Sequence, residues 1–168
     1  MMIYEIALKK INKDNFSDYG TYIDENQIAP TYSDSAFDWW NAVGTIDIEG
    51  KTSVGFVRPN FNPEFSEQVF EAHNHTPEVL VPIDDDVIVL VGKKTAFDNE
   101  LPAKEDFEAF LVPTGMAVCL NPGVWHHAPM TLSGSVKTLV LFKENTSFED
   151  TTVKDLKEQG LVIKVKID

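Results

Sequence analysis

Short segments of β-type residues, each bounded by turn-forming residues, run through most of this sequence. Strands are predicted at residues 3–8, 43–48, 53–58, 78–82, 86–91, 107–112, 116–120, 124–128, 136–142 and 161–167. Short helices are predicted at 12–20, with Asn12 and Gly20 as caps, and from about residue 150 to Gly160. Many short strands with few helices indicate an all-β sandwich or barrel and disfavour a βαβ fold.

Length and composition favour one ordinary globular domain. A chain of 168 residues, 43% of them apolar, fits a single domain over residues 1–168. The formal charge of −13 argues against a nucleic-acid partner or an anionic membrane surface, since both would repel it. We expect a cytoplasmic protein, because no signal-peptide pattern or membrane-spanning stretch is recognisable. Cys119, the single cysteine, has no partner for an internal disulfide.

All four histidines fall in two tight clusters. The first is Glu71-Ala-His73-Asn-His75-Thr-Pro-Glu78, and the second is Asn121-Pro-Gly-Val-Trp-His126-His127. In an extended segment His73 and His75 project from the same face, and a kink at Thr76-Pro77 would bring Glu78 round to join them. Imidazoles and a carboxylate suit Zn, Mn, Fe, Ni or Co. The alternative is a set of hydrogen-bonded structural histidines without metal.

The spacing of these residues resembles the two sequence motifs of the cupin superfamily. The matching residues are His73-x-His75-x2-Glu78 followed by Pro122-Gly123-x2-His126. The resemblance implies a jelly-roll β-barrel with a few short peripheral helices. It also implies one divalent transition metal (Zn, Mn, Fe or Ni) held by His73, His75, Glu78 and His126.

A narrower resemblance covers most of the chain. Phe16-Ser-Asp-Tyr-Gly20, Glu71-x-His73 and Val124-Trp-His-His-x-Pro129 are similar to segments of the ureidoglycolate lyase family. That family implies a carbon–nitrogen lyase, often a homodimer, that splits ureidoglycolate into glyoxylate and urea in allantoin (purine) degradation. A dimer would offer a shared edge strand at residues 3–8. The implied partner is a small carboxylate substrate.

Several residues are candidates for catalysis. Glu78 is either the fourth metal ligand or a general base. Only one of His126 and His127 can face a barrel interior in an ordinary strand, so His127 either supports the fold or reaches the site through an irregular turn. Lys143 is a candidate for neutralising a substrate carboxylate. Glu71 either orients a histidine or is a solvated strand residue.

Two further residues are candidates for substrate binding. Arg58 is the only arginine in the chain and ends a predicted strand, where its planar guanidinium could bind a carboxylate with two hydrogen bonds. Trp125 either contacts substrate or packs beside its turn. Two other functions remain open: a different metal-dependent cupin enzyme (an isomerase, dioxygenase or decarboxylase of a small carboxylate), or a non-catalytic cupin that binds a small molecule.

Overall fold

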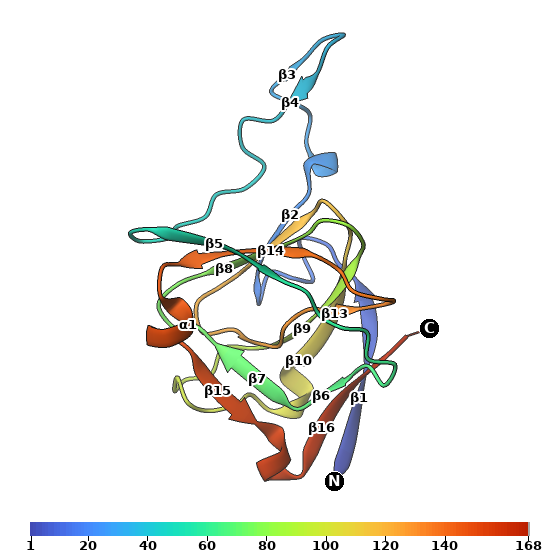
Figure 1. Cartoon of the computed structure of the whole chain (residues 1–168), viewed down its shortest axis with the longest axis vertical. Coiled ribbons are helices and arrows are strands. Elements are labelled where there is room, and N and C mark those ends of the chain that lie inside the picture. Colours follow the sequence, from blue (N-terminus) through green and yellow to red (C-terminus); the bar gives the residue numbers. More distant parts are fainter. Residues whose placement is uncertain (168) are drawn as a thin grey trace.

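The strands of this protein curl into a jelly-roll β-barrel (Figure 1). The computed structural model describes residues 1–167. The elements are β1 (Met2–Lys10), β2 (Gly20–Ile23), η1 (Glu25–Gln27), β3 (Tyr32–Ser33), β4 (Asp38–Trp39), β5 (Thr52–Val57), β6 (Ser66–Glu67), β7 (Val69–Ala72), β8 (Glu78–Pro82), β9 (Val87–Gly92), η2 (Lys104–Asp106), β10 (Phe107–Val112), β11 (Ala117–Leu120), β12 (Trp125–His126), β13 (Met130–Thr131), β14 (Thr138–Lys143), α1 (Thr146–Glu149), β15 (Thr152–Asp155), η3 (Leu156–Gln159) and β16 (Leu161–Lys166).

Two sheets form the walls of the barrel. One is nine-stranded, in the order β15-β7-β12-β9-β10-β1-β16-β6, with β13 also paired to β9. The other is five-stranded, in the order β2-β11-β8-β14-β5. The connections from β7 to β8 and from β11 to β12 pass between the sheets, so residues at those strand ends from both sheets meet in the interior.

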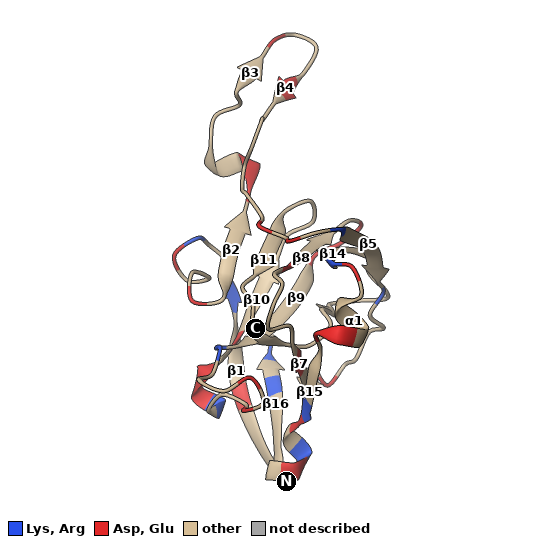
Figure 2. Cartoon of the chain, turned by 90° about the vertical axis from the view of Figure 1, so that its left-hand side faces the viewer, with Lys and Arg blue, Asp and Glu red and all other residues tan. Residues whose placement is uncertain are grey.

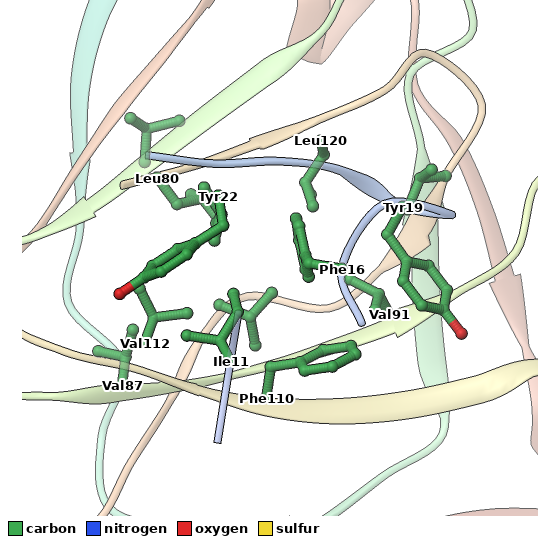
Figure 3. Close-up of a cluster of buried hydrophobic side chains, with 14 of the residues drawn as sticks. Ile11, Phe16, Tyr19, Tyr22, Leu80, Val87, Val91, Phe110, Val112 and Leu120 are labelled. Carbon is green, nitrogen blue, oxygen red and sulfur yellow. The ribbon is translucent and has the colours of Figure 1, made fainter. Parts of the chain in front are cut away.

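Strand β9 separates two hydrophobic cores, because it is buried along its whole length. Val87, Val89 and Val91 face the barrel interior, while Ile88 and Leu90 pack on the opposite side of the sheet. Figure 3 shows part of the interior core, to which β8, β9, β10 and β11 contribute Leu80, Val91, Phe110 and Leu120. The second core lies beneath β7, β12 and β16 and includes Phe70 and Trp125. Alternation along each strand therefore decides which residues reach the interior.

The all-β prediction is confirmed, and two strands have the predicted limits, β8 and β10. Strand β1 extends beyond both ends of the predicted segment at residues 3–8. It lies between β10 and β16, so it is not the edge strand that a shared dimer sheet would need.

Three predicted elements were wrong. Residues 12–20 form successive turns, in which the Asn12 side chain accepts from the amides of Asp14 and Asn15 without a continuous helical ladder. Residues 43–48 form no strand. The predicted helix before Gly160 begins as strand β15, which pairs with β7, and only 156–159 are helical. Pairing with a distant strand overrides local helix signals in such short segments.

Residues 24–50 form an arm that projects away from the barrel (Figures 1 and 2). Strands β3 and β4 pair at its tip, and the Trp40 indole donates to the carbonyl of Ile28. Tyr32, Phe37 and Trp39 are exposed on it. Among the described residues, no helix has the length and apolar character that a membrane span requires.

Candidate metal centre

Strands β7 and β12 direct three polar side chains into the barrel. Phe70 and Ala72 of β7 pack into the second core, on the side of the sheet away from the barrel interior and called the outer core below. Glu71 between them therefore faces the interior. On β12, Trp125 packs into the outer core and His126 faces inward. His126 pairs directly with Glu71 across the two strands. The side chain of His73, one residue beyond β7, is also buried.

The turn before β12 joins the two histidine clusters. Asn121-Pro122-Gly123-Val124 forms a tight turn in which the amide of Val124 donates to the carbonyl of Asn121 at 3.2 Å. Gly123 has a φ of +86°, which a type II turn requires at its third position and which glycine adopts without a steric penalty. Its amide donates to the carbonyl of His73 at 2.7 Å. This backbone bond holds His73 beside the start of β12.

Four side chains then meet at one point in the interior. Nε2 of His73 lies 2.9 Å from Oε2 of Glu78, and Nε2 of His126 lies 3.5 Å from the same oxygen. Oε1 of Glu71 lies 3.8 Å from Nε2 of His126. Glu71, His73 and His126 each offer one possible ligand atom, and these three atoms all lie within 4.8 Å of one another.

Backbone carbonyls fix the tautomers of both rings. Nδ1 of His73 donates to the carbonyl of Asp150 at 2.9 Å, and Nδ1 of His126 donates to that of Val124 at 3.0 Å. Because Nδ1 donates in each ring, Nε2 is the atom that would bind a metal at the shared point, in place of any proton it carries. Nε2 of His126 is buried and has no hydrogen-bond partner.

These residues fit a divalent transition metal. Ligand atoms about 2.0–2.2 Å from one ion lie about 3 Å apart, which is close to the separations from Glu78 to the two rings. Imidazole and carboxylate donors suit Zn, Mn, Fe, Ni and Co alike.

The electrostatics of the cluster are those of a buried charged pair. Burial alone would raise the pKa of Glu78, but the two imidazoles outweigh it and lower that pKa to about 2. Burial alone would lower the pKa of His126, but the carboxylate of Glu78, with a smaller effect from Glu71, raises it to about 9. In the metal-free protein His126 therefore holds a proton at neutral pH, and a bound ion would replace that proton.

A cavity of about 210 Å³ opens beside the cluster. Glu71, His73 and Glu78 line one side of it. The rest of its lining comes mainly from the five-stranded sheet and from the segments that flank it: Gly55, Phe56, Val57, Leu80, Ala128, Pro129, Val140, Phe142 and Ser147. The side chain of Glu71 is 39% exposed, whereas that of Glu78 is only 9% exposed, so Glu71 is the carboxylate within reach of a bound molecule.

The structure places His75 outside this cluster. Strand β7 ends at Ala72, so His75 lies in a turn rather than on the extended face assumed from sequence. Its ring is 77% exposed, and its Nδ1 lies 2.8 Å from Oδ1 of Asp150. The Asp150 carboxylate also accepts from the amides of Asn74 and His75. The pair therefore fixes the turn that carries His73.

His127 and Lys143 do not line the cavity beside the cluster. Nε2 of His127 lies 3.2 Å from Oε2 of Glu67, and His127 lines a separate cavity of about 170 Å³ that Glu71 and His126 also reach. Lys143 follows Phe142 on β14, and because Phe142 lines the cavity, alternation turns Lys143 away from it. The structure brings neither of these two predicted catalytic side chains to the 210 Å³ cavity, whereas Glu78, the third, lines it.

The two predicted substrate-binding residues are also elsewhere. Arg58 is exposed just past the end of β5 and is not part of the cavity lining. Trp125 is buried in the outer core, where its indole donates to Oγ1 of Thr95 at 3.4 Å. Its position on β12 next to the inward-facing His126 accounts for this.

Sequence reasoning left the role of Glu71 open and did not place it in the site. The available signal was the two-residue spacing in Glu71-x-His73, which puts both side chains on one face of an extended segment. The His73-x-His75 pair has the same spacing. Because β7 ends at Ala72, Glu71 is on the strand and His75 is not.

Comparisons with known proteins give one family. The ureidoglycolate lyase family model matches residues 3–167. No curated protein matches the sequence significantly. The hydroxypropylphosphonic acid epoxidase from S. wedmorenis is similar at 20% identity, covering 54% of this chain and 42% of that chain, with a TM-score of 0.41. The chain thus spans about two fifths of that enzyme. The WlaRB TDP-quinovose 3,4-ketoisomerase from Campylobacter jejuni is similar at 14% identity, covering 74% and 81%, also with a TM-score of 0.41.

Proposed function

The chain belongs to the ureidoglycolate lyase family, and from this premise we propose that it is a metal-dependent carbon–nitrogen lyase. Its substrate is ureidoglycolate or a related small α-hydroxy carboxylate, and its product is glyoxylate, together with urea where the substrate is ureidoglycolate. The ion is a divalent transition metal in the barrel interior.

One atom carries this proposal, Nε2 of His126. It is buried, has no hydrogen-bond partner and points at Glu78, toward which Nε2 of His73 also points. A buried polar atom without a partner is costly, and a cation between these three side chains would satisfy all of them. We therefore assign His73, Glu78 and His126 to the ion.

The reaction needs a base and an acid. The central carbon of ureidoglycolate carries a hydroxyl, a nitrogen and a carboxylate. Removing the hydroxyl proton lets its oxygen form a carbonyl as the C–N bond breaks, and the departing nitrogen takes up a proton. A bound divalent ion supplies Lewis acidity that lowers the pKa of the hydroxyl.

We assign the role of base to Glu71. It lines the cavity, and its carboxylate lies beside the ion-binding residues without being enclosed by them. The same carboxyl group, once protonated, can return the proton to the departing nitrogen.

The test is release of glyoxylate and urea. Protein stripped of metal and then reloaded with Zn, Mn, Fe or Ni is incubated with ureidoglycolate and with N-substituted α-hydroxyglycines. We expect glyoxylate from the reloaded protein and none from the stripped protein or from His126→Ala. No glyoxylate from any α-hydroxyglycine, with any of these ions bound, would rule the lyase out.

A second candidate function rests on the composition of the ligand set. Two histidines and one carboxylate, with the remaining coordination positions open, form the set used by non-haem Fe(II) oxygenases. His73, His126 and Glu78 match that set. Oxygen uptake by the Fe(II)-loaded protein in the presence of an α-hydroxy carboxylate would favour this function over the lyase.

A further inference from the structure

The cavity beside the candidate metal centre has one polar side and one apolar side. The polar side consists of Glu71, His73 and Glu78. The apolar wall comprises Val57 of β5, Leu80 of β8, Val140 and Phe142 of β14, and Pro129. Alternation along β8 and β14 turns Leu80, Val140 and Phe142 to the interior face of the five-stranded sheet, where Glu78 adjoins them.

This wall offers little to a second polar group of a substrate. None of the described residues that line the cavity is a lysine or an arginine. Ser147 is the neutral side chain there that can form hydrogen bonds. A substrate carboxylate would thus depend on the ion, and the terminal amide of a urea group would face Val57, Val140 and Phe142. Burying such an amide without partners costs about tenfold or more in affinity.

We propose that the substrate carries an apolar acyl group where ureidoglycolate carries its carbamoyl group. The substrate class is therefore the N-acyl-α-hydroxyglycines, and this inference rests on the lyase function proposed above. The hydroxyl loses its proton, its oxygen becomes the aldehyde oxygen of glyoxylate, and the C–N bonding pair leaves with the nitrogen. That nitrogen gains a proton, so the second product is a primary carboxamide, and no oxidant or reductant is needed.

The size of the cavity limits the acyl group. Pockets for drug-sized ligands are about 300–1,000 Å³, whereas this cavity is about 210 Å³. The head of the substrate occupies the part beside Glu71 and the ion. The acyl group is therefore short, such as a branched chain of a few carbons or a single ring.

The first experiment compares substrates on the metal-loaded protein. Glyoxylate release is measured with carbamoyl, acetyl, isobutyryl and benzoyl derivatives of α-hydroxyglycine. We expect kcat/KM to be lowest for the carbamoyl compound and to rise about fourfold for each methylene newly buried. A higher kcat/KM for the carbamoyl compound than for every acyl compound would overturn the inference while supporting the lyase function.

The second experiment measures binding without turnover. Calorimetry of the metal-loaded protein with glycolate, lactate and 2-hydroxy-3-methylbutanoate should show affinity rising along the series. The Val57→Thr variant keeps the shape of the wall but adds a hydroxyl, and it should weaken binding of the branched acid about five- to tenfold relative to glycolate. Val54→Thr is the matched control, because Val54 is on the same strand but 69% exposed.

The two experiments separate the two proposals. Equal affinity for all three acids, or an equal loss in Val54→Thr and Val57→Thr, would overturn the apolar specificity. Rising affinity without glyoxylate from any α-hydroxyglycine would support an apolar subsite and overturn the lyase function.

Discussion

Nε2 of His126 lies 3.5 Å from Oε2 of Glu78 inside the barrel, with no hydrogen-bond partner of its own. The same carboxylate oxygen lies 2.9 Å from Nε2 of His73. Nδ1 of each ring donates to a backbone carbonyl, so both Nε2 atoms point at one carboxylate. Such an arrangement could hold a cation, and four predictions test the proposed centre.

Purified protein should contain or take up about one divalent transition metal ion per chain. His73→Ala and His126→Ala should each weaken metal binding by more than about 100-fold, since losing a ligand costs more than losing a residue that only orients one. Elemental analysis after dialysis measures this. His75→Ala is the matched control and should keep its metal, because the His75 ring is exposed. Full metal content in His73→Ala and His126→Ala would contradict the assignment of these two histidines as ligands.

The two carboxylates of the site should have different roles, Glu78 as a metal ligand and Glu71 as the general base. Glu78→Gln should lose the ion, because Glu78 lies between the two imidazoles. Glu71→Gln should retain the ion and lose about 10²–10⁴-fold in kcat, the usual contribution of a general base. Metal content and steady-state kinetics are measured on the same preparations. Equal loss of metal in the two variants would instead make Glu71 a ligand.

The metal-free protein should lose stability in alkaline solution. The pKa of His126 is raised from 6.5 to about 9, so its contribution is complete below pH 6.5 and disappears as the pH rises through 9. The pKa of Glu78 is lowered from 4.5 to about 2, so its contribution is present above pH 4.5 and is lost as the pH falls toward 2. The pair therefore stabilises the fold most between about pH 4.5 and 6.5.

Denaturant unfolding of the metal-free wild type and His126→Gln measures this effect. The difference in free energy of unfolding between them should shrink by up to about 3 kcal/mol between pH 6.5 and pH 9 or above. A difference that does not change over this range would show that His126 is neutral in the metal-free fold.

Asp150 should tune metal binding through the turn after β7. Its carboxylate accepts from the amides of Asn74 and His75, and although burial raises its pKa, the hydrogen bonds from these two residues hold that pKa below the usual value. Asp150→Ala should lower the free energy of unfolding by about 1–3 kcal/mol and weaken metal binding about tenfold. Metal titration and chemical denaturation measure both quantities.

His75→Ala is the control for that variant. It removes only the exposed contact between the His75 ring and Asp150, so it should cost less than about 1 kcal/mol and leave metal affinity unchanged. Unaltered metal affinity in Asp150→Ala would show that the turn holds His73 without the carboxylate.

The sequence alone determined the fold class and most of the strands. Continuous runs of β-type residues between turn signals gave the limits of β8 and β10, because such runs report burial of a strand directly. It also predicted that His73, Glu78 and His126 lie close together, and the structure brings them together. The Pro122-Gly123 turn was recognisable because only glycine adopts its backbone conformation readily.

The tertiary structure alone decided which neighbours reach the interior. Strand β7 ends at Ala72 because β12 and β15 pair with it only that far, so Glu71 faces the cavity and His75 remains outside. Trp125 packs into the second core and His126 faces the barrel interior, because adjacent residues of β12 point to opposite sides of the sheet. Arg58 and Lys143 fall outside the cavity lining, although both follow residues that contribute to it. Each of these outcomes depends on pairing between segments distant in sequence, and local residue patterns carry no information about that pairing.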